Sequence, residues 1–253
     1  VTVMISPVAA RDDFYGIFFP DWQIATEAAR KLAREGVGLS MVRLSSPAET
    51  EVNLTLASHD RLMGLLKKYL GLRQVRPEKM CMCLLGITGS SDEVRFSKRK
   101  IFSVIRRFKG VSAGKIMGRA WKKERFRAPY LRNTLWDMGY AVDTLETAVT
   151  WDRVMPTLGK METALQDGLS ELNEKVLVLT HLSHIYSSGS SIYITFIFRL
   201  GKNSEDTLQR WKRLKKAASL AILSSGGTIS HQHGVGRDHA KFLIKEKSPL
   251  GVV

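Results

Sequence analysis

Two β-rich runs separated by a loop of small residues decide the fold of this chain. Residues 176–186 read VLVLTHLSHIY, residues 187–190 read SSGS, and residues 191–200 read SIYITFIFRL. Glycine and serine tolerate the tight backbone of a turn, so a loop of this composition between two such runs is typical of a β-hairpin. The chain is therefore expected to contain a pair of long antiparallel strands.

Strands and helices alternate on either side of this hairpin. Further strands are expected over residues 14–19, 40–44, 79–87 and 140–149. Residues 79–87 are apolar on both faces, which predicts a strand in the centre of a sheet. Apolar residues recur at helical spacing between these runs. Helices are expected after Asp21, from Pro47, after residues 59–60, from Ser90, around Pro129, over residues 151–172 and over residues 204–225.

Capping residues and apolar stripes support these helices. Asp21 is placed to cap the first helix, and Ser90 with Glu93 has the spacing of a capping box. Other helices are marked by stripes of apolar residues that we expect to face the core. These stripes are Leu62, Leu65, Leu66 and Tyr69; Leu131, Leu135 and Met138; and Val154, Leu158, Met161 and Leu165.

The pattern predicts an α+β fold with a largely antiparallel sheet and helices packed on one face. A repeating βαβ pattern is not seen, and the sequence contains neither a G-x-G-x-x-G motif nor a P-loop, so it lacks a standard phosphate cradle. The chain opens inside a strand-like run at Val1 and stops without a closing element. We expect it to be a piece of a longer protein.

Composition narrows the class of protein. The 253 residues suit one large domain or two small ones, and 44% hydrophobic with 25% charged residues is ordinary globular usage, which excludes disordered and collagen-like chains. No apolar run approaches the roughly 20 residues of a membrane span. Cys81 and Cys83 are too few for a disulfide framework or a metal site, so a reducing compartment is expected. We expect a cytoplasmic protein, at most peripheral to a membrane.

The net charge of +15 concentrates in one segment. Residues 95–127 hold thirteen Lys and Arg residues against one acid. Such a stripe suggests nucleic-acid binding, but no recognition motif accompanies it and aromatic residues are not interleaved for stacking. The same positions fit the outer faces of helices beginning near Ser90 and Ala120. Docking to an acidic partner or a membrane surface, or attraction of an anionic substrate, explains the charge as well. Nucleic acid is not expected as a partner.

Three histidines fall within nine residues near the C-terminus. His231 and His233 are two apart, so in an extended segment they point the same way, and residues 234–236 (GVG) let the backbone approach a ligand closely. Imidazole there could take a proton, bond to a flavin or ligate a metal. The alternative is a polar loop with solvated histidines. Zinc needs three or four ligands, and no carboxylate or thiolate lies at a suitable interval, so no metal is expected.

Other polar residues are weaker candidates. His184 and Tyr186 alternate on one face near the loop end of the hairpin, where a tyrosine can act as acid or base or can simply form an amphipathic rim. Arg132, with Arg125 and Arg127, flanks Pro129, and its planar guanidinium suits a carboxylate or phosphate, although surface arginines are common.

The remaining charged candidates lie on strands. Arg43 lies on an otherwise apolar strand, so it is expected to be paired. Asp143 and Glu146 lie on opposite faces of their strand, which disfavours a paired-carboxylate mechanism.

Four motifs together resemble a known family. They are residues 121–133 (WKKERFRAPYLRN), 144–153 (TLETAVTWDR), 183–193 (SHIYSSGSSIY) and 227–239 (GTISHQHGVGRDH). In this order they resemble the alkyldihydroxyacetonephosphate synthases and their bacterial relatives, which are FAD-linked enzymes of the vanillyl-alcohol oxidase superfamily. The resemblance covers nearly the whole chain. It implies that residues 1–9 end the FAD-binding domain and that residues 10–253 form the C-terminal cap domain, which closes over the flavin and builds the substrate pocket.

The resemblance also implies roles for individual residues. Arg132 would face the phosphate or carboxylate of the substrate, and Arg43 would support substrate binding. Tyr186 would donate and accept the proton, while His231 and His233 would take part in catalysis beside the flavin. The same histidines and Gly234 would contact the cofactor, FAD, although this part alone is expected to bind it weakly or not at all.

One position departs from the family pattern. The family usually shows three consecutive histidines, and this chain has Gln232 in the middle. Glutamine exchanges hydrogen bonds but cannot shuttle a proton near neutral pH. If the middle residue is the base in relatives, catalysis is absent here or has moved to a neighbour.

Three functions remain open from the sequence. The first is an ether-lipid synthase that exchanges acyl for alkyl on dihydroxyacetone phosphate, and the second is an FAD-dependent dehydrogenase of a 2-hydroxy acid such as glycolate or D-lactate. A non-catalytic basic module that binds nucleic acid ranks last. The partners expected are a small anionic substrate, a membrane surface in peripheral contact, and a second copy of the chain in a homo-oligomer.

Overall fold

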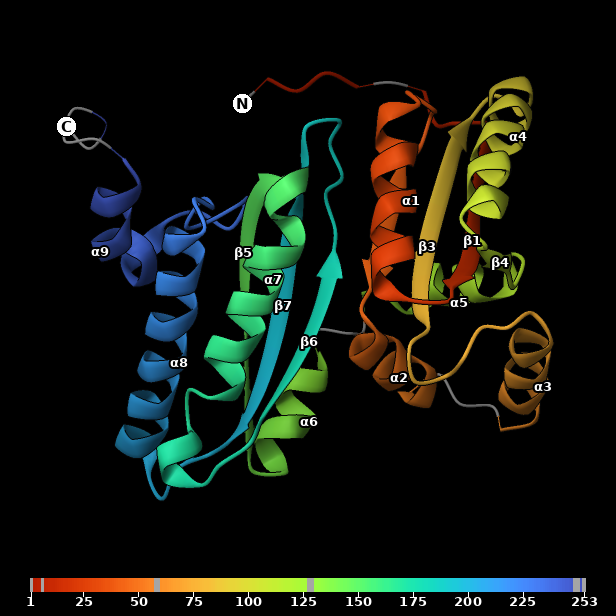
Figure 1. Cartoon of the computed structure of the whole chain (residues 1–253). Coiled ribbons are helices and arrows are strands. Elements are labelled where there is room, and N and C mark those ends of the chain that lie inside the picture. The colour runs from red at the N-terminus through yellow and green to blue at the C-terminus, as the bar shows by residue number, and fades with distance from the viewer. Residues whose placement is uncertain (1, 6, 57–59, 127–129, 248–250, 252–253) are drawn as a thin grey trace. The chain divides into compact units, whose positions relative to one another are not determined.

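The computed structural model describes residues 2–5, 7–56, 60–126, 130–247 and 251. The chain divides into two compact units, Val1–Arg125 (unit 1) and Phe126–Val253 (unit 2). Each unit combines an antiparallel sheet with helices, which confirms the α+β class (Figure 1).

Unit 1 is built on strands in the order β4-β1-β3-β2, and every neighbouring pair is antiparallel. Strand β3, which is apolar on both faces, lies inside the sheet as predicted. The strands are β1 (Arg11–Phe19), β2 (Met41–Ser45), β3 (Cys81–Gly89) and β4 (Val111–Ser112). The helices are α1 (Trp22–Arg34), α2 (Pro47–Leu56), α3 (Asp60–Leu72), α4 (Ser91–Arg107) and α5 (Ile116–Glu124).

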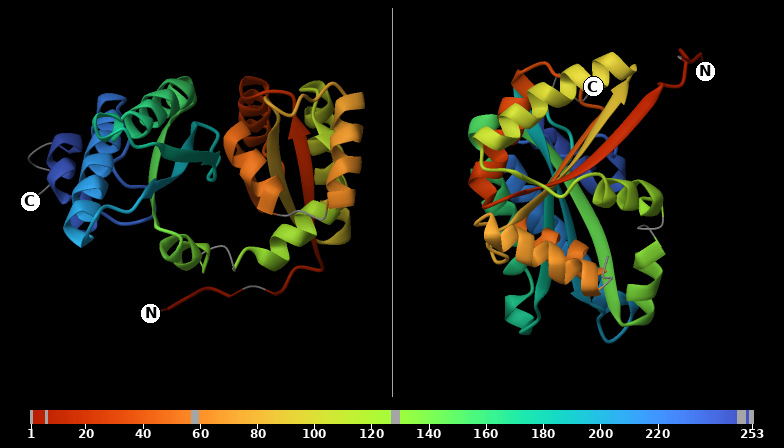
Figure 2. Two further views of the ribbon diagram at one scale, coloured as in Figure 1. Left: turned by 90° about the horizontal axis from the view of Figure 1, so that it is seen from below. Right: turned by 90° about the vertical axis from the view of Figure 1, so that its right-hand side faces the viewer.

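Helices cover both faces of the unit 1 sheet. Tyr15 of β1 packs edge-on against Phe102 of α4, with ring centroids 5.2 Å apart. The adjacent residue, Phe14, points to the opposite face and meets Trp121 of α5 at 5.9 Å. The prediction of helices on one face is therefore wrong for unit 1, because a central strand that is apolar on both faces must be covered on both (Figure 2).

Most of the helix starts predicted for unit 1 are confirmed. The carboxylate of Asp21 accepts a hydrogen bond from the backbone of Ile24 at 2.8 Å, and Ser90 and Glu93 form a capping box on α4. Pro47 begins α2. Helix α3 differs, because Leu65 and Tyr69 are 65% and 43% exposed. Leu66 packs inward as predicted, and the residues beside it are Met63 and Leu70 rather than Leu65 and Tyr69.

Unit 2 contains the predicted hairpin. Its strands run in the order β6-β7-β5, and β7 pairs antiparallel with both neighbours. The strands are β5 (Tyr140–Thr150), β6 (Val176–Leu182) and β7 (Gly189–Arg199). The helices are α6 (Leu131–Asp137), α7 (Trp151–Gln166), the 3-10 turn η2 (Ser170–Leu172), α8 (Ser204–Ser224) and α9 (Gly236–Glu246).

Helices α7 and α8 lie over the same face of the unit 2 sheet (Figure 1), as the α+β prediction requires. The predicted stripe of α7 is buried. Helix α7 ends at Gln166 rather than at residue 172. The first strand of the hairpin, β6, ends at Leu182 rather than at residue 186. The stripe predicted for α6 is wrong, because Leu131 and Met138 are 40% and 65% exposed. The predicted helix start at Pro129 lies outside the described residues.

The candidate site lies on the face of the unit 2 sheet that is opposite these helices. Side chains alternate along a strand, and Leu145 and Ile194 are fully buried towards the helices. Glu146 lies opposite Tyr193, which in turn lies opposite His181, so these three residues form one row across β5, β7 and β6. The ring of His181 stacks on that of Tyr193 at 4.7 Å.

Candidate functional site

A buried carboxylate is the centre of the candidate site. Glu146 lies on β5 and is only 5% exposed. The segment that follows α8 runs along the outer edge of β5. There the backbone N–H of His231 donates to the carbonyl of Glu146 at 3.1 Å, and that of Thr228 donates to the carbonyl of Ala148 at 3.4 Å. These bonds bring a loop that is distant in sequence onto the strand.

Two histidines share the two oxygens of this carboxylate. Nδ1 of His231 lies 3.2 Å from Oε1 of Glu146, and Nε2 of His233 lies 3.2 Å from Oε2. Between them, Gln232 adopts a φ of 60° and its side chain is exposed. The left-handed turn at Gln232 thus lets both flanking histidines reach Glu146 while the middle side chain does not take part.

Tyr186 completes a line of three polar groups. Its Oη lies 3.1 Å from Nε2 of His231, so the imidazole of His231 stands between the phenol and the carboxylate of Glu146. The indole Nε1 of Trp151 donates to the carbonyl of Tyr186 at 3.0 Å and holds its backbone. Tyr186 is 43% exposed and borders an open groove of about 490 Å³. Arg153 lines the same groove.

Further polar residues support Glu146. The hydroxyl of Ser183 donates to Oε1 at 2.9 Å and lies 2.8 Å from the hydroxyl of Ser191. Nε2 of His184 lies 3.9 Å from the same Oε1. Ligand atoms of Glu146, His184 and His231 all fall within 4.8 Å of one another, a spacing compatible with three ligands of one metal ion. Spacing along the sequence was therefore a poor guide to the ligands available, because the fold brings Glu146 to the histidines.

The other predicted residues lie apart from this cluster. Gly234 follows His233 with a φ of 72°, and its carbonyl accepts a hydrogen bond from the hydroxyl of Ser230 at 2.7 Å. Arg132 is exposed on α6, and among the described residues no contact joins it to Tyr186 or the histidines. Arg43 belongs to unit 1, where its guanidinium is bound to Glu49.

The third histidine of the C-terminal segment has a different environment. His239 lies on α9, and its Nδ1 is buried without a hydrogen-bond partner among the described residues. Burial lowers the pKa of His239, and the nearby charge of Lys215 lowers it further. This histidine is therefore held in its neutral form and does not share Glu146.

Sequence reasoning missed Glu146. Its signal was the second acid, after Asp143, of a strand that is otherwise free of charge, and it was considered only as a partner for Asp143. Asp143 does point to the other face, where its carboxylate accepts hydrogen bonds from Trp211 at 2.6 Å and binds Lys215 at 3.2 Å. Its charge is thus used structurally, whereas Glu146 faces the histidines.

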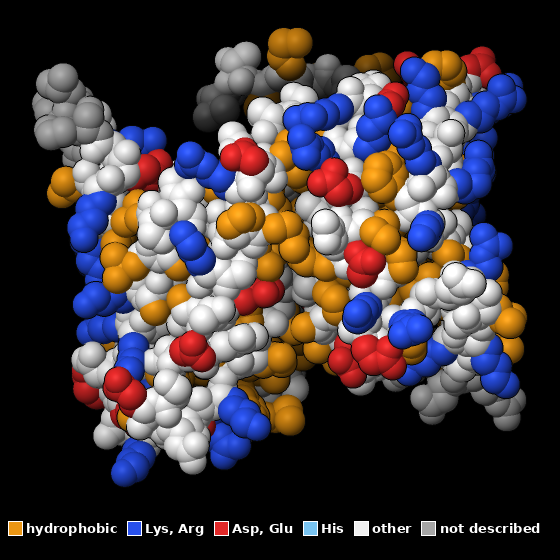
Figure 3. Space-filling model, in the orientation of Figure 1, with side chains coloured by type: hydrophobic (Ala, Val, Ile, Leu, Met, Phe, Trp, Pro, Cys, Tyr) orange, Lys and Arg blue, Asp and Glu red, His pale blue; other side chains and the backbone are white. Residues whose placement is uncertain are grey.

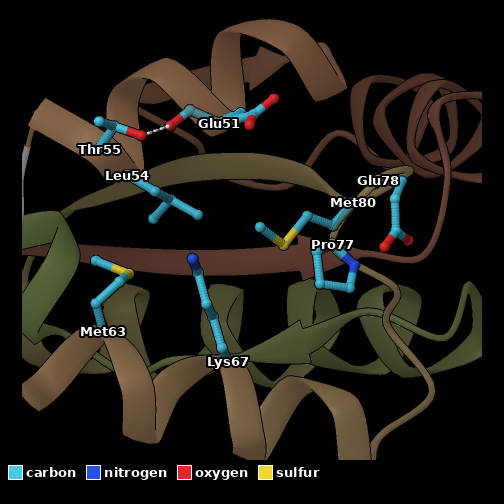
Figure 4. Close-up of a pocket in the computed structure, with 8 residues that line it drawn as sticks. All are labelled: Glu51, Leu54, Thr55, Met63, Lys67, Pro77, Glu78 and Met80. Carbon is cyan, nitrogen blue, oxygen red and sulfur yellow. Dashed lines mark hydrogen bonds between the residues drawn. The ribbon is translucent and has the colours of Figure 1, made fainter. Parts of the chain in front are cut away.

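Unit 1 has a cavity of its own, of about 620 Å³, between α2, α3 and the chain leading into β3. Figure 4 shows Lys67 directing its amine into the space between Leu54 and Met80, with Met63 beside it. The residues that line this cavity are partly apolar (Leu54, Met63, Pro77 and Met80) and partly charged (Glu51, Lys67 and Glu78). None of the residues predicted from the sequence lines this cavity.

The basic segment lies mostly on outer faces, as one interpretation of the sequence held. Lys and Arg side chains gather over α4 in Figure 3, where all six basic residues between Arg95 and Arg107 are exposed. The second of the two helices begins at Ile116, not near residue 120. Some basic residues bind acids of β1, since Lys115 pairs with Asp13 at 2.7 Å and Lys122 pairs with Asp12. Within the described residues, no helix has the length and apolar character needed to cross a bilayer.

Comparison with known proteins gives consistent matches. Residues 9–253 match the family model described as FAD linked oxidases, C-terminal domain. The chain is 25% identical over 239 residues to the alkyldihydroxyacetonephosphate synthase of Dictyostelium discoideum, covering 92% of this chain and 39% of that protein. Identity to the protein of the same name from Trypanosoma brucei brucei is 22% over 245 residues, covering 94% of this chain and 40% of that protein. The chain spans about two fifths of the length of these curated relatives.

A solved structure of an alkyldihydroxyacetonephosphate synthase shares the fold. It superposes with a TM-score of 0.79 at 22% sequence identity, covering 94% of this chain and 43% of that one.

Proposed function

This chain belongs to the family of FAD linked oxidase C-terminal domains, and on this premise we propose that it forms the substrate-binding cap of a flavoenzyme of the alkyldihydroxyacetonephosphate synthase type. Such an enzyme exchanges the acyl group of acyl-dihydroxyacetone phosphate for a fatty alcohol, with no net redox change. The proposal is supported by relatives of that name and by the polar cluster of unit 2.

The single observation that carries this proposal is the contact between Tyr186 and His231. A phenol whose Oη lies 3.1 Å from an imidazole nitrogen has a partner that can take its proton. Tyr186 is also 43% exposed and borders an open groove, so a substrate can approach its side chain. Acyl-for-alkyl exchange needs a group that removes and returns a proton on the substrate carbon skeleton, and we propose Tyr186 for this role.

The polar groups around Tyr186 also fit a flavin. The flavin ring carries an N–H group as well as carbonyl oxygens and ring nitrogens, so it can donate to an imidazole nitrogen and accept from a backbone N–H. Gly234 has open space where a side chain would stand, so its backbone is approachable. FAD, when bound, would supply the electrophilic ring to which the substrate adds. The residues of this chain that we propose to face it are His231, His233 and Gly234.

An anionic substrate group requires a cation near the groove. Arg132 is the residue implied by the resemblance, and it is exposed on α6. Arg153 already lines the groove beside Tyr186, with its guanidinium bonded to the carbonyl of Ser225 at 3.4 Å. We propose Arg132 as the phosphate-binding residue. Arg132→Lys should therefore weaken substrate binding more than the comparison variant Arg153→Lys.

Titration of the purified chain with FAD, followed by flavin fluorescence, is the first experiment. Saturable quenching that is lost in the double variant His231→Ala/His233→Ala would show a usable flavin face. Conversion of acyl-dihydroxyacetone phosphate and a fatty alcohol to the alkyl product, lost in Tyr186→Phe, would then support the synthase. Binding of FAD without any exchange by the unaltered chain would overturn it.

A 2-hydroxy acid dehydrogenase is the second candidate. The imidazole of His233 is 40% exposed and is backed by the carboxylate of Glu146, an arrangement suited to taking a hydroxyl proton while hydride leaves for the flavin. Bleaching of the flavin absorbance on addition of glycolate or D-lactate would favour this reaction. A flavin that remains oxidised with these acids favours the synthase.

A further inference from the structure

We propose that Glu146 is the positioning residue of the site: it fixes the proton of His231 on Nδ1, so that Nε2 is left as the base that accepts the proton of Tyr186. The tautomer assignment stands on the geometry of unit 2 alone. Its use in catalysis rests on the proposed function.

The tautomer follows from electrostatics. Nδ1 of His231 is buried and lies 3.2 Å from Oε1 of a carboxylate that is itself 3% exposed at its side chain. The pair is too poorly aligned for a good hydrogen bond, yet it is close. An unprotonated Nδ1 would set its lone pair against a negative oxygen at this distance, which a water-poor environment makes costly. A proton on Nδ1 turns the same contact into an attraction.

The second oxygen of Glu146 acts on His233 in the same way. Nε2 of His233 lies 3.2 Å from Oε2, so the proton of this imidazole is expected on Nε2. Ser183 adds a hydroxyl donor to Oε1 at 2.9 Å. One carboxylate therefore imposes opposite tautomers on two histidines that are separated by a single residue, Nδ1–H on His231 and Nε2–H on His233.

The consequence for Tyr186 is a defined direction of proton transfer. With its proton on Nδ1, His231 offers a lone pair on Nε2, and the phenol of Tyr186 donates to it across 3.1 Å. When the proton moves from Oη to Nε2, His231 becomes an imidazolium beside the carboxylate of Glu146. The phenolate of Tyr186 then takes a proton from the substrate in the groove. A carboxylate that orients and stabilises an imidazole in this way is the logic of catalytic triads.

Tautomers can be read directly by nuclear magnetic resonance. In the chain labelled with ¹⁵N-histidine, long-range ¹H–¹⁵N spectra distinguish a protonated from an unprotonated ring nitrogen at neutral pH. The expected result is Nδ1–H for His231 and Nε2–H for His233. The spectra are recorded with a chelator present, so that a bound metal ion does not mimic a substituted nitrogen. His231 in the Nε2–H form, or His233 in the Nδ1–H form, would overturn the assignment.

The variant Glu146→Gln tests whether this residue is the cause. Its amide presents both a donor and an acceptor, so His231 should shift towards a mixture of tautomers. Glu162→Gln, which removes the charge of a partly buried carboxylate of the same unit that is bonded to Thr180, should leave the spectrum unchanged. Unchanged tautomers in folded Glu146→Gln would refute the proposal. If that variant does not fold, Glu146→Asp, which keeps the charge, should retain the Nδ1–H form.

Kinetics separate this inference from the proposed function. In the active flavoprotein, Glu146→Gln should lower kcat by about 10²- to 10⁴-fold with little change in KM, and Glu146→Asp should recover part of the loss. The expected tautomers without any exchange activity would refute the synthase but not the role of Glu146 in setting the tautomer. Exchange activity that survives Glu146→Gln would refute that role in catalysis.

Discussion

The guanidinium of Arg43 lies 2.5 Å from the carboxylate of Glu49, with Nη2 facing Oε1. Arg43 projects from β2 and its side chain is 32% exposed, whereas that of Glu49 on α2 is 6% exposed. The expectation that Arg43 is paired is confirmed. The proposed contribution of Arg43 to substrate binding must therefore compete with a structural bond between β2 and α2.

Arg43→Ala should lower the free energy of unfolding by about 1–3 kcal/mol, because it removes a cation from a buried carboxylate. Urea unfolding measures this loss. Adding Glu49→Gln to Arg43→Ala should recover part of the stability, since the buried charge is then gone. An Arg43→Ala chain as stable as the unaltered one would favour a role in substrate binding over a structural one.

Glu162→Gln should stabilise the protein at neutral pH. Burial raises the pKa of Glu162 above its ordinary value of 4.5, although a hydrogen bond from Thr180 at 2.6 Å partly opposes the shift. Because the pKa is higher in the folded state, the contribution of Glu162 is fully favourable below pH 4.5 and is lost as the pH rises through the folded pKa. Glutamine keeps an acceptor for Thr180 and carries no charge.

Unfolding curves of both proteins at pH 4 and pH 7 check the sign of this effect. The stability difference in favour of Glu162→Gln should be larger at pH 7. A difference that is larger at pH 4 would contradict the burial argument.

Gln232→His should change the activity of the flavoprotein little, because the side chain at position 232 is exposed and both oxygens of Glu146 are already occupied. Gln232→Gly should stabilise the chain by up to about 1 kcal/mol, since glycine adopts a φ of 60° without steric cost. Assays of exchange and of thermal unfolding measure the two effects. A large gain in activity for Gln232→His would mean that the middle residue does reach the reacting groups.

Gly189→Ala should strongly destabilise unit 2. A Cβ at Gly189 would lie 2.1 Å from the carbonyl oxygen of Val149, a backbone atom that cannot move away without disturbing the pairing of β5 and β7. Gly159→Ala is the matched control, because a Cβ at this position of α7 meets nothing within 4 Å. Alanine there should stabilise the helix by about 0.5–1 kcal/mol. Equal effects of the two variants would contradict this difference in environment.

Cys81 and Cys83 should not react with a thiol reagent in the folded chain. They are 0% and 2% exposed, and burial raises the pKa of Cys83 to about 12 and also raises that of Cys81. The thiolate is the reactive form, so few thiolates are available at pH 8. Titration with an aromatic disulfide at pH 8 should detect no thiol before denaturation and both afterwards. Rapid reaction of the native chain would indicate that β3 opens.

The sequence allowed the strands and most helices to be predicted because their signals are local. Alternation, capping residues and the small-residue loop at residues 187–190 each act over a few residues. Helices α3 and α6 were harder, because a short apolar stripe such as that of α6 does not reveal whether a sheet is available to cover it. The ends of α7 and β6 were also missed, since the residues beyond them are compatible with either state.

The candidate site was predictable only in part. Tyr186, His231 and His233 were chosen from motifs, and the structure does bring them together. Their shared partner, Glu146, was not recognised, because nothing near it in sequence shows that the loop after α8 will lie along β5. Contacts between segments so far apart depend on the sheet register and on the route of the chain.

The hydrogen bonds that hold this loop on β5 have a second consequence. Strand β5 is the last in the order β6-β7-β5, and an uncovered outer strand is a template for pairing with other chains. The backbone of Thr228 and His231 occupies carbonyls of that outer strand. The loop that carries the histidines therefore also limits strand pairing between copies of the protein. A mutation that detaches this loop from β5 should lower solubility as well as catalytic activity.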